Sequence, residues 1–464
     1  MVTRADTFSR LAALRPVRPL PQKPATLRAP DETDPLGRLL GAGVARNHYG
    51  EHLAIRNWFS TPEFVSPSPI SLELLWRAPQ PSVRLRVKAG RCKERARESP
   101  ARQACAAVEN PENWLFLDTE TTGLSGGTGT YAFLIGMAWW DAGGLQVEQL
   151  FLRDFSEEHS VLYELSARLA ERPVLVTFNG KSFDWPLLEN RFTLTRSIAT
   201  PRLAAHLDLL HPARALWRLR LGSVRLVELE RQVLDPSRLG WRREDDVVSA
   251  EIPGYYFDYL RGGAPDPLAA VVKHNQMDLR GLAALFGRIN NMLDARGTDV
   301  EGVESLDLFG LARFLQRRGE TKRAHSACSM ALDAGLPQEF RPQATRDLAV
   351  MAKRRGELER AASLWEQLIV DSRDGMAACE QLAIYYERRM RDFARALEFA
   401  QLGLAKAERT WKLARDPSLA ARSARFEQRL VQRVQRLQAR MAAKRQSLLC
   451  ESATAVNVTK AADV

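Results

Sequence analysis

Residues 114–124 read WLFLDTETTGL, an apolar run followed by two acids that are separated by one residue. A short, continuous apolar run of this kind is typical of a buried strand. Residues two apart in a strand face the same side, so Asp118 and Glu120 are expected to project together from its end. Two neighbouring carboxylates repel each other, and a hard dication such as Mg²⁺ or Mn²⁺ would neutralise them. A solvent-exposed strand end without a metal would show the same letters.

Further strands and helices are expected around this one. Residues 131–140 are apolar and are followed by DAGG (141–144) and LQVEQLFL (145–152), which indicates two strands joined by a glycine turn. Residues 174–178 indicate a fourth buried strand, and Pro186 favours a helix start because proline fits the first helical turn. Residues 161–169 and 271–289 have a helical period. The pattern predicts an α/β domain with a mixed sheet whose first three strands are antiparallel.

Two further acids follow elements that the sheet could bring together. Asp184 comes after the buried strand, in NGKSFDWP, where it could point back to the sheet edge or simply cap the next helix. His274 and Asp278 in HNQMD are four residues apart and would share one face of a helix. Each signal alone has an ordinary structural explanation, and their order along the chain favours one shared site.

These residues resemble the DEDD superfamily of 3′-to-5′ exonucleases with a ribonuclease H-like fold, and within it the YprB-like predicted exonucleases. The resemblance covers roughly Trp114 to Ile289. The superfamily's motifs are D-x-E, N-x-x-x-F-D, and an Asp preceded by Tyr or His. They match Asp118 and Glu120, then Asn179, Phe183 and Asp184, then His274 and Asp278.

The resemblance implies a nuclease that uses two Mg²⁺ or Mn²⁺ ions to activate a water and stabilise the leaving oxygen. Asp118 would bridge the ions, Glu120 and Asp278 would bind the ion that activates water, and Asp184 would help to hold the second ion. Superfamily members with a His usually place it five residues before the Asp, whereas His274 lies four before Asp278. The role of His274 as general base therefore stays open against orienting water or touching the scissile phosphate.

The resemblance also implies that Thr121, Thr122 and Leu124 lie beside the terminal nucleotide of the substrate, with Leu124 wedged against the last bases. Asn179 is part of the second motif, and Lys181 could meet a phosphate or be solvated.

Weaker candidates lie outside the motifs. The glycines of SGGTGT (125–130) lack the GxxxxGK[ST] pattern, so a flexible turn is expected there. A structural role is favoured for Asp208 and His211. The acidic run 244–246 is expected to be a solvated loop.

Past residue 300 the pattern is helical and repetitive. Arg-Ala pairs recur at Arg323-Ala324, Arg360-Ala361 and Arg395-Ala396, with spacings close to the 34 residues of a tetratricopeptide helix pair. An unrelated helical bundle is the alternative. Beyond the repeats, an apolar stripe (Phe426, Leu430, Val434, Leu437, Met441) runs beside a stripe of arginines. This predicts a capping helix, with a nucleic-acid- or membrane-surface helix as the alternative.

Composition limits the class of protein. The net charge of +11 favours polyanionic partners, although most basic runs are only solvated faces. Five cysteines without metal or disulfide spacing indicate a reducing, cytoplasmic compartment. The longest apolar run is about half of what a membrane span needs. The arginine-rich N-terminus leaves an organelle transit peptide as an alternative.

The predicted organisation is a disordered segment (1–38), a small substructure (39–83), a basic linker (84–110), an exonuclease domain (111–295), tetratricopeptide-like repeats (300–415), a basic amphipathic helix (416–446) and a disordered tail (447–464). The predicted substrate is DNA or RNA, with single-stranded 3′ ends favoured, and the repeats would bind a protein partner or extend the binding surface. A binding scaffold with a weakly active or inactive domain and a structure-selective endonuclease remain as alternatives.

Overall fold

The chain forms two compact units, residues 1–301 and residues 302–464. The computed structural model describes residues 27–28, 34–76, 100–123, 127, 129–234, 239–243, 246–295, 303–370, 375–413 and 417–460. Leu124, Glu244 and Asp245 lie outside the described residues, as do the segment 1–26 and residues 84–99 of the predicted basic linker.

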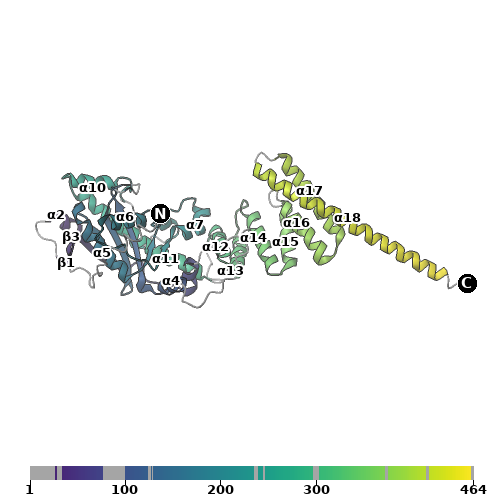
Figure 1. Cartoon of the computed structure of the whole chain (residues 1–464), viewed down its shortest axis with the longest axis horizontal. Coiled ribbons are helices and arrows are strands. Elements are labelled where there is room, and N and C mark those ends of the chain that lie inside the picture. Colours follow the sequence, from purple (N-terminus) through teal and green to yellow (C-terminus); the bar gives the residue numbers. More distant parts are fainter. Residues whose placement is uncertain are drawn as a thin grey trace, which may run out of the picture. The chain divides into compact units, whose positions relative to one another are not determined.

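The first unit is built on one eight-stranded mixed sheet (Figure 1). Strand β4 pairs antiparallel with β5, and β5 pairs antiparallel with β6, as predicted. On the other side of β4, strands β7 and β8 are parallel to it. The strand order is β1 (Leu27–Arg28), β2 (Gly43–Asn47), β3 (Gly50–Phe59), β6 (Gly144–Phe151), β5 (Ala132–Asp141), β4 (Trp114–Thr121), β7 (Val174–Thr177) and β8 (Ala205–Asp208). The predicted α/β fold is confirmed.

The N-terminal strands extend this sheet. Strand β3 pairs antiparallel with β6 from Leu53 opposite Phe151 to Phe59 opposite Leu145. Residues 39–83 were expected to form a small substructure that leans on the next domain, whereas β2 and β3 are strands of the main sheet itself. The prediction missed them because the partner strand β6 lies about 90 residues further along the chain.

The turn between β5 and β6 is the tight hairpin that the glycines predicted. Ala142 and Gly143 both have positive φ values, 49° and 84°. Two such residues in a two-residue loop match the right-handed twist of the flanking strands.

Helices cover both faces of the sheet. On one face, Gln149 of β6 donates to the carbonyl oxygen of Val272 in α11 (Asp266–Asp294), and Trp114 of β4 packs against Phe286 of the same helix. On the other face, Arg168 of α5 (Glu158–Glu171) pairs with Glu148 of β6. Side chains alternate along a strand, so Asp118 and Glu120 share the face of Trp114, which is the face that α11 covers.

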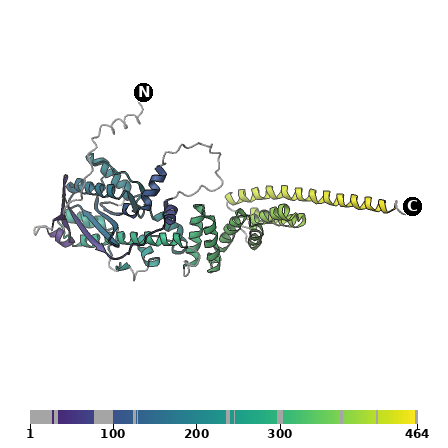
Figure 2. The same ribbon diagram turned by 90° about the horizontal axis from the view of Figure 1, so that it is seen from below.

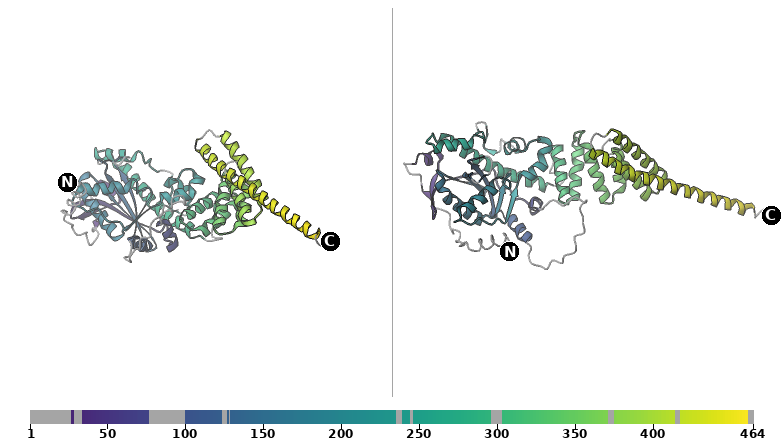
Figure 3. Two further views of the ribbon diagram at one scale, coloured as in Figure 1. Left: turned by 45° about the vertical axis from the view of Figure 1, so that its right-hand side comes forward. Right: turned by 45° about the horizontal axis from the view of Figure 1, so that its top comes forward.

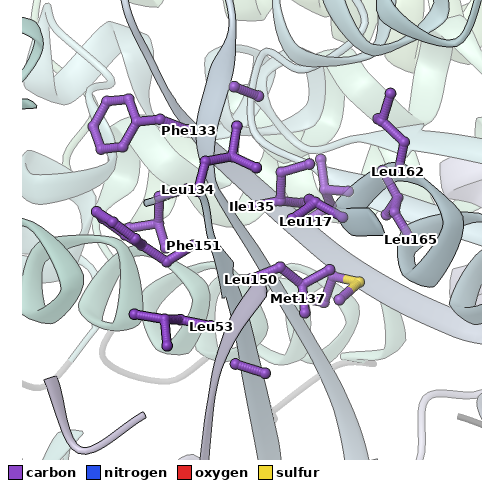
Figure 4. Close-up of a cluster of buried hydrophobic side chains, with 14 of the residues drawn as sticks. Leu53, Leu117, Phe133, Leu134, Ile135, Met137, Leu150, Phe151, Leu162 and Leu165 are labelled. Carbon is purple, nitrogen blue, oxygen red and sulfur yellow. The ribbon is translucent and has the colours of Figure 1, made fainter. Parts of the chain in front are cut away.

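The core of this unit lies between the sheet and its helices. Figure 4 shows Leu162 and Leu165 of α5 beside Leu117 and Ile135 of the strands, and these four side chains are at most 2% exposed. The remaining helices of the unit are α2 (Pro35–Leu40), α3 (Pro69–Trp76), α4 (Pro100–Glu109), η2 (Pro111–Asn113), η3 (Phe155–Glu157), α6 (Asp184–Thr195), α7 (Leu210–Leu221), α8 (Leu226–Gln232) and α10 (Ile252–Leu260). Helix α2 begins inside the segment expected to be disordered, and α4 lies inside the expected linker.

The described part of the second unit is helical. Its helices are α12 (Ser305–Arg317), α13 (Thr321–Asp333), α14 (Arg341–Arg354), α15 (Leu358–Leu368), α16 (Gly375–Tyr385), the π-helix η5 (Tyr386–Met390), α17 (Phe393–Leu413) and α18 (Pro417–Lys460). Successive helices pack in pairs around small buried residues such as Ala361 and Ala396. That these pairs are tetratricopeptide repeats stays a prediction.

Helix α18 packs onto these pairs through part of its apolar stripe. Leu430 and Leu437 are fully buried in the cluster that α18 forms mainly with α17, and Arg429 pairs with Glu380 of α16. Figures 2 and 3 show the yellow C-terminal end of α18 extending beyond the helices that its first half contacts. The helix continues to Lys460, so it includes most of the segment expected to be a disordered tail.

Among the described residues, no helix is both long and apolar enough to cross a membrane.

Candidate active site

The two acids of β4 lie at the end of that strand with a bulge just after Glu120. Asp118 pairs across the sheet with Gly136 of β5. A Cβ atom at Gly136 would lie 2.1 Å from Oδ1 of Asn275 and 2.8 Å from Cδ1 of Leu279, both in α11. The missing side chain of Gly136 therefore lets α11 approach the sheet beside Asp118.

The second acid, Asp184, is the first residue of α6. The N-cap of α6 is Phe183, which makes no side-chain capping bond. The sequence left open whether Asp184 caps this helix, and it does not. Its carboxylate accepts a hydrogen bond from the Thr119 hydroxyl at 2.5 Å. Thr119 lies between Asp118 and Glu120, and this bond ties α6 to the acidic end of β4.

The third segment is α11, where His274 and Asp278 lie one turn apart on one face. Nε2 of His274 is 3.6 Å from Oδ2 of Asp278. The His274 side chain is almost completely buried.

The charges of the four carboxylates act on one another. Burial raises the pKa of Asp118 well above its ordinary value, and the charges of Asp278, Glu120 and Asp184 raise it further. Burial and then Asp278, Asp184 and Asp246 raise the pKa of Glu120 in the same way. Burial also raises the pKa of Asp184. Acids from β4, α6 and α11 are thus coupled electrostatically, and their shared role in one site stays a prediction.

The acidic group has the chemistry of a site for a hard dication. All four donors are carboxylates, and their mutual repulsion is what a bound cation would relieve. Among the described residues, no three His, Cys, Asp or Glu side chains already converge on one ion position. Binding would therefore require the carboxylates to turn toward a common centre. The donor set fits Mg²⁺ or Mn²⁺, and the ligand roles stay a prediction.

Asp118 is held by a buried amide pair that the sequence analysis missed. Nδ2 of Asn275 donates to Oδ2 of Asp118 at 2.8 Å, and Nε2 of Gln149 donates to Oδ1 of Asn275 at 2.8 Å. Gln149 and Asn275 are both fully buried. The signal available in the sequence was a glutamine inside the apolar strand LQVEQLF, because buried polar groups need partners.

A buried arginine reaches the same site from the segment after α8. Arg243 donates to Glu230, to Asp246 at 2.9 Å and to Oδ1 of Asp278 at 2.5 Å. The charges of these acids and their hydrogen bonds raise the pKa of Arg243 despite its burial, which keeps it cationic. Asp246 also contacts Nδ1 of His274 at 2.6 Å. The expectation that the acidic run is a solvated loop is wrong for Asp246, because long-range contacts with α11 decide its position.

The structure describes two of the three residues expected to border the terminal nucleotide. Thr121 lines a cavity beside Glu120 and Asp184. The hydroxyl oxygen of Thr122 accepts a hydrogen bond from the backbone N–H of Tyr131, so this side chain already has a partner within the protein. Leu124 lies outside the described residues.

The loop after β7 is organised by Asp208. This carboxylate accepts from the backbone N–H groups of Asn179 at 2.8 Å, Lys181 at 3.1 Å and Leu210 at 3.0 Å. These bonds hold Asn179 in a positive φ of 69°. The structural role expected for Asp208 agrees with these contacts. The Lys181 side chain is exposed and lines neither cavity described next.

Two cavities flank the acids. One, of about 420 Å³, is lined by Glu120, Asp184 and the apolar side chains of Phe183, Leu187 and Ile252. The other, of about 570 Å³, is lined by His274 and Asp278 together with residues of α7 and α8. Ser249 lines both. The acidic group is therefore reachable from two sides.

Comparison with known proteins agrees with this architecture. Residues 115–290 match the model of the RNase H superfamily. The chain is also similar to YprB, an uncharacterized protein of Bacillus subtilis, with 32% identity over 302 residues. That similarity covers 64% of this chain and 70% of the Bacillus protein.

Proposed function

This chain belongs to the family of Bacillus subtilis YprB, and we propose that it is a divalent-metal-dependent 3′-to-5′ exonuclease acting on DNA or RNA. The observation that carries the proposal is the group of four carboxylates from three elements. Each of Asp118, Glu120 and Asp184 has a raised pKa, so the group is destabilised without a cation. Proteins retain such arrangements at functional sites.

The chain's own residues would prepare this site for reaction. Asp118, Glu120, Asp184 and Asp278 would hold Mg²⁺ or Mn²⁺, which supplies activation of water and stabilisation of the leaving oxygen. Asn275 fixes one oxygen of Asp118, and Thr119 fixes one of Asp184. His274 presents Nε2 on the side of Asp278, where it could accept a proton from water or orient it.

The contact between Arg243 and Asp278 favours a second candidate function. A guanidinium at 2.5 Å already neutralises one of the four acids. If Arg243 stays there when nucleic acid binds, the domain would be a binding scaffold with little or no hydrolysis. The same assay separates the two candidates.

The test uses purified full-length protein with 5′-labelled single-stranded DNA and RNA, in Mn²⁺ or in EDTA. The proposal expects a ladder that shortens from the 3′ end only with Mn²⁺. Asp118→Asn should lower the rate at least about 100-fold, because it removes a charged ligand of the ions. Asp141→Asn, the same change at an exposed end of β5, should leave the rate unchanged. Binding without cleavage by the wild type would replace the exonuclease with the scaffold, and cleavage of a closed circular strand would indicate an endonuclease.

Thermal unfolding tests the proposed metal site without an activity assay. A raised pKa means that the folded state holds the Asp118 proton more tightly, so ionisation of Asp118 destabilises the fold as pH rises above its ordinary pKa of 3.8. In EDTA, Asp118→Asn should therefore melt at a higher temperature than the wild type, by a margin that grows with pH. Mn²⁺ should raise the melting temperature of the wild type more than that of the variant. Equal shifts in both proteins would place the bound ion elsewhere.

For the second unit we propose tetratricopeptide-like repeats that bind a protein partner. The packed helix pairs and the small buried residues between them support this. We also propose that the protein works in a reducing, cytoplasmic compartment. Cys328 and Cys379 are buried free thiols, which is consistent with this.

A further inference from the structure

The larger of the two cavities has cations that the proposed reaction does not use. Its lining runs from His274 and Asp278 to Arg214 and Arg218 of α7 and to Arg225, just before α8. Its volume is about 570 Å³. Arg214 and Arg218 are four residues apart, so they lie on one face of α7, about 6 Å apart along its axis.

These three arginines are exposed and make no ion pair with any described residue. Other arginines of the same unit are paired with acids, as Arg243 is with Glu230 and Arg168 with Glu148. Three unneutralised guanidinium groups around one cavity produce a positive potential next to a strongly acidic centre. Such a potential attracts a polyanion to a site that its own carboxylates would otherwise repel.

We propose that this cavity binds the phosphates of a single-stranded nucleic acid on the retained side of the bond that is cut. This inference rests on the proposed exonuclease function and identifies the part of the substrate that the arginines contact. A released mononucleotide carries one phosphate, whereas the retained strand offers several. Arginine is suited to this role because its planar guanidinium donates two parallel hydrogen bonds to a phosphate.

Binding without cleavage is the first test. The dissociation constant of a fluorescent single-stranded oligonucleotide is measured in EDTA at several salt concentrations, with wild-type protein and with a triple variant (Arg214→Ala, Arg218→Ala, Arg225→Ala). The triple variant should bind at least tenfold more weakly. Its plot of log affinity against log salt should be shallower by about 2, since each lost phosphate contact contributes about 0.7 for single strands.

A matched control removes the same charge elsewhere. Arg38, Arg202 and Arg231 are exposed, belong to the same unit and line neither cavity. Changing these three to alanine should leave the affinity and the salt dependence near those of the wild type. Equal weakening by both triple variants would mean that only net charge matters, and equal binding by all three proteins would also overturn the inference.

A small substrate separates this inference from the proposed function. The p-nitrophenyl ester of thymidine 5′-monophosphate has no retained strand. With Mn²⁺, the cavity variant should lose at least tenfold more kcat/KM on an oligonucleotide than on this ester. Similar losses on both substrates would overturn the inference, because the arginines would then act at the reaction centre or on the fold. If the wild type cleaves neither substrate, the exonuclease proposal fails while the binding comparison still decides the role of the arginines.

Discussion

The proton on His274 is controlled by its neighbour Asp246. Burial raises the pKa of Asp246, but hydrogen bonds and charges from His274 and Arg243 lower it overall, so it remains a carboxylate. A carboxylate only accepts hydrogen bonds, and therefore Nδ1 of His274 must carry the proton at this 2.6 Å contact. In the neutral form of the ring, the lone pair is then on Nε2, on the side of Asp278.

Removing Asp246 should therefore slow catalysis without weakening substrate binding. Asp246→Ala frees the ring to rotate and to change tautomer, and we expect kcat to fall by about 10- to 100-fold with little change in KM. Asp246→Asn, whose amide oxygen can still accept from Nδ1, should lose less. Steady-state kinetics on a labelled oligonucleotide with Mn²⁺ measures both parameters.

A double-mutant cycle shows whether Asp246 acts through His274. His274→Ala alone should lower kcat by a comparable factor, and adding Asp246→Ala to it should cost little more. Asp246 also contacts Arg243, so a role through that arginine would persist when His274 is absent. Multiplicative losses in the double variant would contradict the positioning role.

At the scale of elements, the sequence predicts the features that depend on the residue pattern within a single segment. The apolar runs of β4, β5 and β7 identify strands, and Asp118, Asp184 and Asp278 were each found from a position at the end of, or on, a predicted element. Contacts between distant segments were not predictable. Asn275 meets Asp118 only because Gly136 lets α11 approach, and Asp246 reaches His274 only through the fold of the segment after α8.

Helix α11 offers two glycines with opposite surroundings. A Cβ atom at Gly281 would lie 2.0 Å from Oε1 of Glu230, the residue that holds Arg243 through two of its nitrogens. A Cβ atom at Gly287, six residues further along, would have nothing within 4 Å apart from its own stretch of helix.

The same substitution should consequently have opposite effects at these two positions. Gly281→Ala displaces the side chain of Glu230, a residue of α8, and should lower the free energy of unfolding by about 1–3 kcal/mol. Gly287→Ala should raise it by about 0.5–1 kcal/mol, because alanine favours the helix more than glycine does. Urea unfolding followed by circular dichroism gives both values. A rise in the free energy of unfolding at both positions would show that packing against α8 does not restrict Gly281.

At the scale of the whole molecule, each unit has its own buried core and its own dominant electrostatic cluster. Residues 1–301 contain the mutually repelling acids, which a cation would stabilise. In residues 302–464, Glu387 of η5 is 3% exposed and bonds with Arg433, Arg436 and Arg440 of α18. Burial raises the pKa of Glu387, but these arginines lower it overall, so its charge stabilises the fold above its ordinary pKa of 4.5.

Calorimetry of the full chain should therefore show two unfolding transitions that respond to different changes. Mn²⁺ should raise only the transition of residues 1–301. Glu387→Gln should lower only the other one at pH 7, on the order of 5 °C, a modest shift because Arg436 and Arg440 are about half exposed. The difference between the variant and the wild type should shrink as pH falls below 4.5, where the stabilising charge of Glu387 is lost. A single transition that both Mn²⁺ and Glu387→Gln displace would mean that the two units unfold as one.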